Sequence, residues 1–213
     1  AIVATSLFSL GTMEGIDRPA IAALYTTHAG TTALFLDIGA NADCRPAFLL
    51  QFGQLGSAFM SKVLSVRQPR IALLSNGEEE GKGTKLVKET HQLLKNSNLN
   101  FVGNVEGFDV LQGVADVVVT DGFTGNVILK LAEDLTESIF LSLKDALGSH
   151  PLAKASKFLW GPPVMSVARR WDYSNIGGGA PLLGVNGNVV MAHGRSDATD
   201  IKNAIGLAHR MIH

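Results

Sequence analysis

The sequence predicts an α/β fold built around a largely parallel sheet, and three observations support this prediction. Short runs of β-branched and aliphatic residues alternate with longer segments of helical periodicity along the chain. The consecutive valines at residues 117–119 suit a strand that is buried on both faces. With 213 residues, of which 46% are hydrophobic and 17% charged, the chain is long enough for one sizeable domain with a buried core.

The first half of the chain is expected to begin with a helix and to continue with alternating strands and helices. Residues 1–10 have the pattern of a helix, whose apolar face carries Ile2, Leu7, Phe8 and Leu10. Pro46 suits the first turn of a helix at residues 46–63, because the N–H that proline lacks has no partner there. Strands are expected at residues 20–26, 32–37, 70–74 and 99–102, and a further helix at residues 84–95.

Residues 114–130 combine a strand, a glycine-rich turn and a helix start, and the rest of the chain is organised around them. The strand expected at residues 115–120 is followed by a turn at residues 121–125 and by a long helix from Asn126. The free N–H groups of a first helical turn and the helix dipole favour a bound anion. The sequence therefore predicts an anion site here, although an ordinary strand–helix connection has the same pattern.

Three loops are expected at the carboxyl ends of the strands, where parallel sheets bind their ligands. They are residues 37–43, 75–83 and 121–126. Together they offer amide donors, backbone N–H groups and Lys82 between two glycines, a set that suits an anionic ligand. The alternatives are a plain surface lysine and, for residues 78–80, a solvated acidic loop. No histidine stands at ligand spacing in this loop, so no metal site is expected.

Charge and cysteine content exclude several classes of protein. The formal net charge is −1, whereas general nucleic-acid binders carry a basic excess, so no nucleic-acid partner is expected. Cys44 is the only cysteine, so no disulfide forms within the chain, and its side chain is expected to be a small buried group. No apolar run reaches the ~20 residues that span a bilayer.

Residues 148–172 are expected to form a protruding amphipathic hairpin, with a turn at residues 161–163. The turn follows from the Gly-Pro-Pro sequence, and the stretch around it is uncharged. The flanking basic residues are Lys154, Lys157, Arg169 and Arg170. An apolar tip with basic flanks suits an anionic membrane surface, while a dimer contact and a core hairpin are the alternatives. The expected membrane contacts are Leu159, Trp160, Val164 and Met165.

Five ordered motifs resemble those of the PlsX family, the bacterial phosphate acyltransferases that make acyl phosphate for phospholipid synthesis. They are residues 15–20 (GIDRPA), 36–43 (LDIGANAD), 103–106 (GNVE), 115–126 (ADVVVTDGFTGN) and 192–194 (AHG). The similarity runs in register over essentially the whole chain. The family's Met-Gly-Gly-Asp and Ser-Ala-Gly-Asn-Thr-Gly motifs are absent. Residues 1–213 are therefore expected to be a single α/β catalytic domain without its N-terminal part, the C-terminal two-thirds of the enzyme.

The resemblance implies a three-layer α/β/α fold related to isopropylmalate dehydrogenases and phosphotransacetylases, and it implies a homodimer. It also implies an enzyme without a cofactor, which transfers a fatty acyl group from acyl carrier protein to inorganic phosphate. The implied location is the cytoplasm, with peripheral association at the inner face of the cell membrane.

Carried over residue by residue, the resemblance implies Lys82 and Asn126 as catalytic residues. Because phosphate is the nucleophile, the lysine holds the dianion, while the amide stabilises the oxyanion or orients phosphate. The implied substrate- and phosphate-binding residues are Asn41, Asp43, Gly122, Thr124, Gly125 and His193. His193 also fits a plain strand-end histidine. The Lys82 loop departs from the family pattern at Ser75, Asn76 and Glu78.

Two further readings of the function stay open. One is another enzyme of the same fold, either a CoA-dependent phosphotransacetylase or a metal- and NAD-dependent hydroxyacid dehydrogenase. The dehydrogenase needs a cluster of metal-binding aspartates, which Asp116 and Asp121 alone do not supply. The other is a non-catalytic membrane-associated scaffold.

Overall fold

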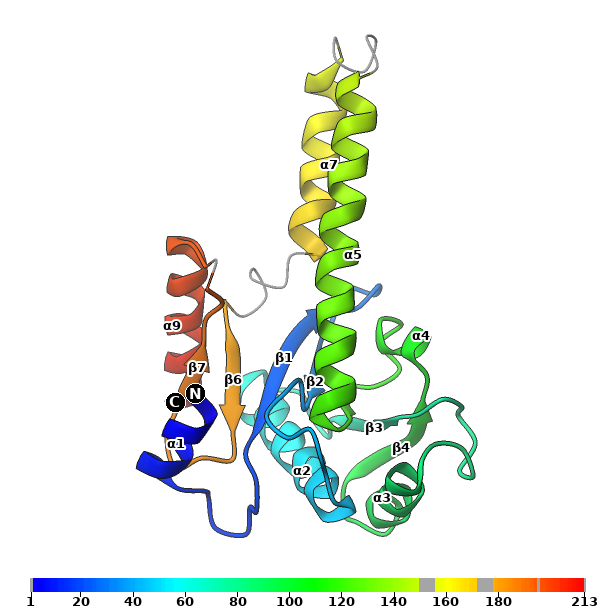
Figure 1. Ribbon diagram of the computed structural model, residues 1–213, viewed down its shortest axis with the longest axis vertical. Coiled ribbons are helices and arrows are strands. Elements are labelled where there is room, and N and C mark those ends of the chain that lie inside the picture. Colours follow the sequence, from blue (N-terminus) through cyan, green and yellow to red (C-terminus); the bar gives the residue numbers. More distant parts are fainter. Residues whose placement is uncertain (1, 150–155, 172–177, 195, 213) are drawn as a thin grey trace.

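The computed structural model describes residues 2–149, 156–171, 178–194 and 196–212. Its centre is a seven-stranded sheet with the order β4-β3-β5-β2-β1-β6-β7 (Figure 1). The strands are β1 (Ala20–Thr26), β2 (Thr32–Leu36), β3 (Arg70–Leu74), β4 (Asn100–Val105), β5 (Val117–Val119), β6 (Ala180–Leu183) and β7 (Val189–Met191). The helices are α1 (Ile2–Leu10), α2 (Pro46–Val63), α3 (Lys85–Lys95), α4 (Gly107–Val110), α5 (Gly122–Ser149), α7 (Lys157–Trp171) and α9 (Ala198–Ile212).

The parallel half of the sheet consists of β2, β5, β3 and β4, which all end at the same edge. The other half is antiparallel, with β1 paired to β2 and to β6, and β6 paired to β7. Only residues 27–31 join β1 to β2, which is too short for the crossover that a parallel pair needs. The predicted α/β fold is confirmed, and its parallel part carries the three loops of interest.

Helices cover both faces of the sheet, so the predicted three-layer arrangement is present. On one face, strand residues pack with Phe52 and Met60 of α2, Leu94 of α3 and Leu207 of α9, all fully or almost fully buried. On the other face, α4 and the first turns of α5 cover a second buried cluster. The valines of β5 alternate between the two clusters, which explains why the whole run is apolar.

The long helix expected from Asn126 begins earlier, at Gly122, so most of the predicted turn lies inside the first turn of α5. Its glycines serve close packing rather than a bend in the chain. A Cβ on Gly125 would overlap the backbone oxygen of Asp37, and one on Gly122 would lie 2.5 Å from the backbone oxygen of Asn41. The helix start therefore sits directly on the loop that follows β2.

The outer part of α5 projects far beyond the sheet, and α7 runs beside it as a helical hairpin (Figure 1). The predicted turn at residues 161–163 is wrong, because Pro162 and Pro163 lie inside α7. Packing along α5 outweighs the local effect of the prolines. The facing side chains line an apolar cavity of about 200 Å³ and are Phe140, Leu143, Pro163, Val164 and Val167.

This packing moves the expected membrane contacts from a hairpin tip to the side of α7. Leu159 and Met165 are exposed, whereas Trp160 and Val164 are half-buried. Phe158 is 75% exposed and was not among the expected contacts. The basic residue Lys154 lies outside the described residues. No helix in the described part of the chain is both long enough and apolar enough to cross a membrane.

Candidate functional site

The loop after β2 is held by the buried carboxylate of Asp37, which is fully inaccessible to solvent. Its Oδ1 accepts hydrogen bonds from the backbone N–H groups of Ile21, Gly39 and Ala40 at 2.9–3.0 Å. Its Oδ2 accepts from the backbone N–H of Asn41 at 2.8 Å and from the Asn41 side chain at 2.9 Å. Five donors therefore satisfy a carboxylate that would otherwise be costly to bury.

Asn41 joins this loop to the neighbouring elements. Its side-chain Nδ2 donates to the backbone oxygen of Pro19 at 2.8 Å as well as to Asp37, and its own carbonyl accepts from the N–H of Gly122 at 2.8 Å. Both side-chain hydrogens are thus used within the protein. Asn41 shapes the loop after β2 through these contacts, and its predicted binding role stays a prediction.

The start of α5 is capped by its own chain. Asp121 accepts hydrogen bonds from the N–H of Thr124 at 2.9 Å and from the Thr124 hydroxyl at 2.8 Å. The N–H of Gly122 is also taken, by Asn41. Two donors of the first helical turn are therefore occupied, and the Asp121 carboxylate lies where an anion was expected. The predicted anion site at the helix start is not open at these positions.

The side chain of Asn126 lies beside the loop after β2. It is exposed on the first turns of α5. A Cβ on Gly39 would lie 3.5 Å from Asn126 Oδ1, so the asparagine side chain covers the glycine. Gly39 has a φ of 141°, which favours glycine, whereas a Cβ there would only reach ordinary van der Waals contact with Asn126. The structure thus brings the first and third predicted loops together around Asn126.

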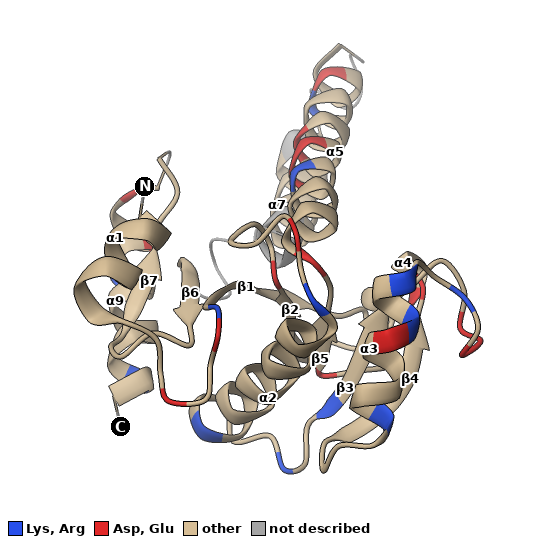
Figure 2. Cartoon of the chain, turned by 60° about the horizontal axis from the view of Figure 1, so that its bottom comes forward, with Lys and Arg blue, Asp and Glu red and all other residues tan. Residues whose placement is uncertain are grey.

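Lys82 lies on the second predicted loop, which leaves the same sheet edge from β3. This charged loop projects away from the start of α5, and Lys82 is exposed on it (Figure 2). The loop is hydrogen-bonded to β4 through Asn104, which donates to Glu79, and to α3 through Gln92 and Lys95, which donate to Glu80. The structure therefore places Lys82 on a loop and Asn126 on the first turns of α5, at the same sheet edge, and does not bring their side chains together.

The two remaining predicted side chains of the site are those of Asp43 and His193. Asp43 is exposed just before α2. His193 follows β7, and the register places it at the opposite sheet edge: Leu183 pairs with Ala20 near the site, while Met191 pairs with Ala180 at the far end. His193 thus lies outside the site within this chain, and its predicted binding role stays a prediction.

Cys44 carries the one thiol of the chain, it lies near the site, and its environment makes it unreactive. Burial raises the pKa of the Cys44 thiol to about 11, with the nearby Asp37 carboxylate adding to the effect. Its Sγ donates a weak hydrogen bond to the backbone oxygen of Asn41 at 3.4 Å. The thiol is therefore protonated at neutral pH, so Cys44 is a packing residue rather than a nucleophile.

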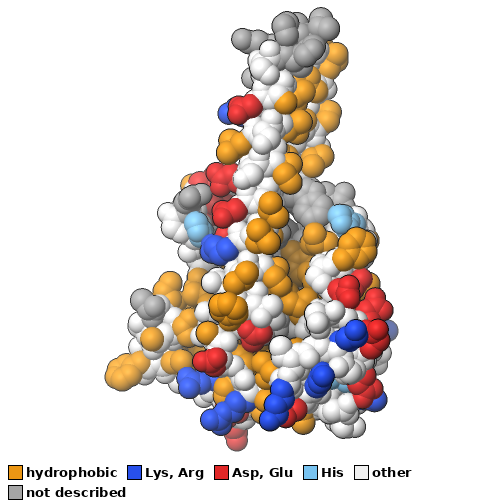
Figure 3. Space-filling view, turned by 45° about the vertical axis from the view of Figure 1, so that its right-hand side comes forward, with side chains coloured by type: hydrophobic (Ala, Val, Ile, Leu, Met, Phe, Trp, Pro, Cys, Tyr) orange, Lys and Arg blue, Asp and Glu red, His pale blue; other side chains and the backbone are white. Residues whose placement is uncertain are grey.

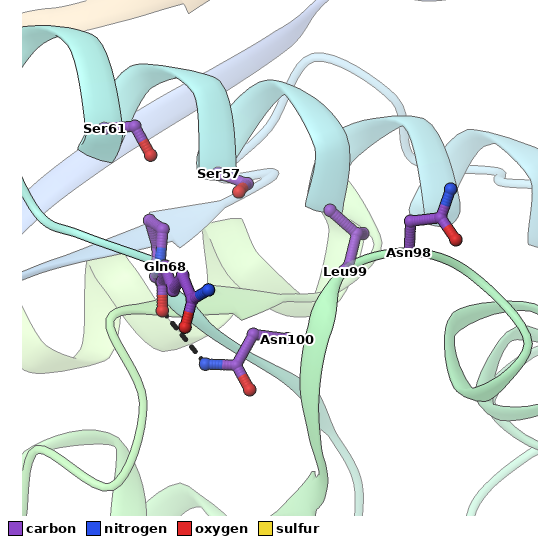
Figure 4. Close-up of a pocket in the computed structure, with 7 residues that line it drawn as sticks. Ser57, Ser61, Gln68, Asn98, Leu99 and Asn100 are labelled. Carbon is purple, nitrogen blue, oxygen red and sulfur yellow. Dashed lines mark hydrogen bonds between the residues drawn. The ribbon is translucent and has the colours of Figure 1, made fainter.

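A cavity of about 510 Å³ lies elsewhere, at the edge where β3 and β4 begin (Figure 4). It is lined by the neutral residues Ser57, Ser61, Gln68, Pro69, Asn98, Leu99 and Asn100. The Asn100 side chain spans part of it, donating to the backbone oxygen of Gln68 at 2.9 Å. Because it opens at the edge opposite the three loops, this cavity does not belong to the candidate site.

The whole chain, residues 1–213, matches the model of a family described as "Fatty acid synthesis protein". A phosphate acyltransferase of Dehalococcoides mccartyi is 48% identical over 212 residues, covering 99% of this chain and 61% of the relative. A phosphate acyltransferase of Alkaliphilus oremlandii is 49% identical over 208 residues, covering 98% of this chain and 62% of the relative. The chain thus spans less than two-thirds of the length of these relatives.

Solved structures show the same fold. A phosphotransacetylase from Streptococcus pyogenes is similar with a TM-score of 0.63 and 20% identity, over 99% of this chain and 59% of the other. A branched-chain phosphotransacylase from Enterococcus faecalis is similar with a TM-score of 0.59 and 19% identity, over 95% of this chain and 66% of the other. The expected structural relation to phosphotransacetylases is confirmed.

Proposed function

Because the chain belongs to the family of fatty acid synthesis proteins, we propose that it transfers a fatty acyl group from acyl carrier protein to inorganic phosphate. The product is an acyl phosphate for phospholipid synthesis. The observation that carries the proposal is the family match over residues 1–213, together with relatives named phosphate acyltransferase that are 48–49% identical. The fold, shared with phosphotransacetylases, is compatible with this chemistry.

In the proposed reaction a phosphate oxygen attacks the thioester carbonyl carbon. The C–S bond then breaks, and the carrier thiolate leaves and takes up the proton that hydrogen phosphate loses. Asn126 donates from its amide to the oxyanion or to phosphate, and Lys82 holds the phosphate dianion by charge. The thiol of Cys44 is protonated and is not expected to attack the thioester, which agrees with phosphate as the nucleophile. The mechanism requires the Lys82 loop and Asn126 to meet on the same phosphate.

An assay with separate acyl donors tests this proposal. The protein expressed from its complete reading frame should release the carrier thiol from acyl carrier protein only when phosphate is present. Acyl-CoA and acetyl-CoA serve as parallel donors. Preference for acetyl-CoA would point to a phosphotransacetylase, and release independent of phosphate would refute phosphate transfer. Absence of any release would favour the non-catalytic scaffold.

We further propose a homodimer that uses the projecting part of α5. Apolar side chains spaced four residues apart form a row along the helix, and each is at least half exposed: Phe123, Val127, Leu131, Leu135 and Ile139. Figure 3 shows hydrophobic side chains gathered along the arm formed by α5 and α7. A continuous row of this kind suits ridge packing against another helix. A second copy of the chain supplies one.

The same arm is proposed to reach the cytoplasmic face of the membrane. Leu159 and Met165 are exposed on α7, next to Phe158. Each such side chain contributes roughly 1.5–3 kcal/mol on burial in the lipid interface, which allows reversible binding. Replacing Leu159 and Met165 with Asp should release the protein from anionic liposomes. The control is Phe108→Asp on α4, which changes a side chain that is 74% exposed and should leave liposome binding intact. Flotation of the double variant with liposomes would assign the arm to the dimer alone.

A further inference from the structure

Residues 103–106 form a motif at the end of β4 that the proposed mechanism does not use. Within it, Asn104 is only 6% exposed, although its side chain is polar. Its Nδ2 donates to the backbone oxygen of Glu79 at 3.0 Å, and its Oδ1 lies 2.8 Å from Nδ1 of His91 on α3. His91 is also 6% exposed, with its ring edge-on to Phe101 at 5.0 Å between ring centroids.

The direction of these hydrogen bonds follows from the chemistry of the groups. Because the Asn104 amide nitrogen donates to Glu79, its oxygen is the acceptor, and His91 Nδ1 must carry the hydrogen. The Asn104 oxygen and His91 Nδ1 thus satisfy each other, while His91 Nε2 lies 3.9 Å from Glu80 Oε2. Removing one leaves a buried polar atom without a partner, which is more costly than losing an exposed hydrogen bond.

The end of this chain of hydrogen bonds is the backbone of Lys82. The Glu79 oxygen that accepts from Asn104 also accepts from the N–H of Lys82 at 2.9 Å. The Lys82 stem then packs over Gly77, where a Cβ would lie 2.7 Å from Lys82 Cγ. One buried amide is therefore joined, through a single carbonyl, to the turn from which Lys82 projects.

The outer side of the loop is fastened to α3 through Glu80. Lys95 Nζ lies 2.8 Å from Glu80 Oε2, and Gln92 also donates to this carboxylate. The hydrogen bonds to Lys95 and Gln92 lower the pKa of Glu80. This attachment is exposed, so it is screened by solvent and weaker than the buried one. The buried side of the loop therefore sets its position.

We propose that Asn104, oriented by His91, is the positioning residue for Lys82. It fixes the turn at residues 79–82, so the lysine side chain extends from one defined backbone position and does not move with the rest of the loop. The catalytic part of this inference rests on the proposed function, whereas the structural part stands by itself. Asn104 touches no reacting atom and acts through the Glu79 carbonyl.

Amide hydrogen exchange on Asn104→Asp tests the structural part. The aspartate is isosteric but cannot donate to Glu79, so exchange in residues 76–83 should become at least about tenfold faster while α2 stays protected. The matched control is Asn100→Asp at the other end of β4, which removes the exposed hydrogen bond to Gln68 and should leave residues 76–83 unchanged. His91→Phe keeps a ring against Phe101 but removes the N–H that donates to Asn104, so it should also speed exchange in residues 76–83. It replaces Asn104→Asp in the test if that variant does not fold.

Kinetics on the same variants test the catalytic part. Asn104→Asp should raise the KM for phosphate and lower kcat by about tenfold or more, with the KM for acyl carrier protein unchanged. In a Lys82→Ala background it should cause no further loss, because it acts through that lysine. Unchanged exchange in residues 76–83, or an equal loss with and without Lys82, would overturn the proposal. A wild-type protein that forms no acyl phosphate refutes the proposed function instead, and exchange alone then decides the inference.

Discussion

Among single residues, Asp37 has the most demanding environment in the site, because five N–H donors converge on one buried carboxylate. Asp37→Asn puts an NH₂ group against N–H donors that need an acceptor, so it should lower the free energy of unfolding by at least about 2 kcal/mol. Asp43→Asn, an exposed neighbour, should stay within about 0.5 kcal/mol of wild type. Urea unfolding of both variants measures this, and equal stabilities would show that the Asp37 charge is unimportant.

The proposed chemistry depends on Lys82 and Asn126. Lys82→Ala and Asn126→Ala should each reduce acyl phosphate formation at least about 100-fold, because a lost phosphate or oxyanion donor raises the barrier directly. The folds should remain intact, since both side chains are exposed. Lys88→Ala, an exposed lysine on α3, is the control and should turn over normally. Near-normal rates in either test variant would remove that residue from the mechanism.

The ion pair between Arg70 and Asp116 makes part of the stability depend on pH. Burial acts to raise the pKa of Asp116, but hydrogen bonds from the side chain and backbone of Arg70 outweigh it and hold the pKa below the ordinary value of 3.8. A lowered folded-state pKa gives stability that is present above the unfolded pKa and is lost as pH falls through the folded one.

Asp116→Asn should therefore destabilise the protein at pH 7, by on the order of 1 kcal/mol because Arg70 is partly exposed. The gap between variant and wild type should narrow as the pH falls below about 4. Unfolding curves from pH 7 to pH 2 give the comparison. A gap that stays constant over this range would mean that the pair does not contribute through its charge.

Among the elements, the start of α5 depends on glycine for its approach to the β2 loop. Gly125→Ala should disturb the site and lower stability by several kcal/mol, because the new Cβ would overlap the Asp37 backbone, which cannot rotate away. Gly148→Ala in the same helix meets no atom within 4 Å and should instead stabilise it by up to about 1 kcal/mol. Thermal unfolding of the pair separates the packing role from helix propensity, and destabilisation by both would contradict it.

Sequence reasoning found the elements whose signals are local. The bounds of α2 follow from Pro46 and a regular apolar period, and β3 from a short aliphatic run. It missed the start of α5, because Gly122 and Gly125 have the composition of a turn while their function is to contact residues some 80 positions earlier. It misplaced the hairpin turn, because packing of α7 on α5 overrides two prolines. It also missed the role of Asp37 in holding the loop after β2, because one of its hydrogen-bond donors, the N–H of Ile21, comes from β1.

For the whole molecule, the proposed dimer covers the apolar row of α5 with a second copy of the chain. Leu131→Asp combined with Leu135→Asp should convert the proposed dimer into a monomer, because each charge would be buried without a partner. Leu93→Asp, on α3 and 39% exposed, should leave the assembly unchanged. Light scattering at micromolar concentration measures the mass. A wild-type protein with the mass of a monomer would contradict the dimer outright.

The most direct test of the account follows the oxygen atoms of phosphate. The complete protein is incubated with acyl carrier protein thioester and phosphate labelled with ¹⁸O at all its oxygens, and the product is analysed by mass spectrometry. Attack by phosphate on the carbonyl carbon predicts an acyl phosphate that keeps every labelled oxygen, formed with release of one carrier thiol. A free fatty acid carrying an oxygen from water, with phosphate left unchanged, would show thioester hydrolysis and contradict the proposed transfer.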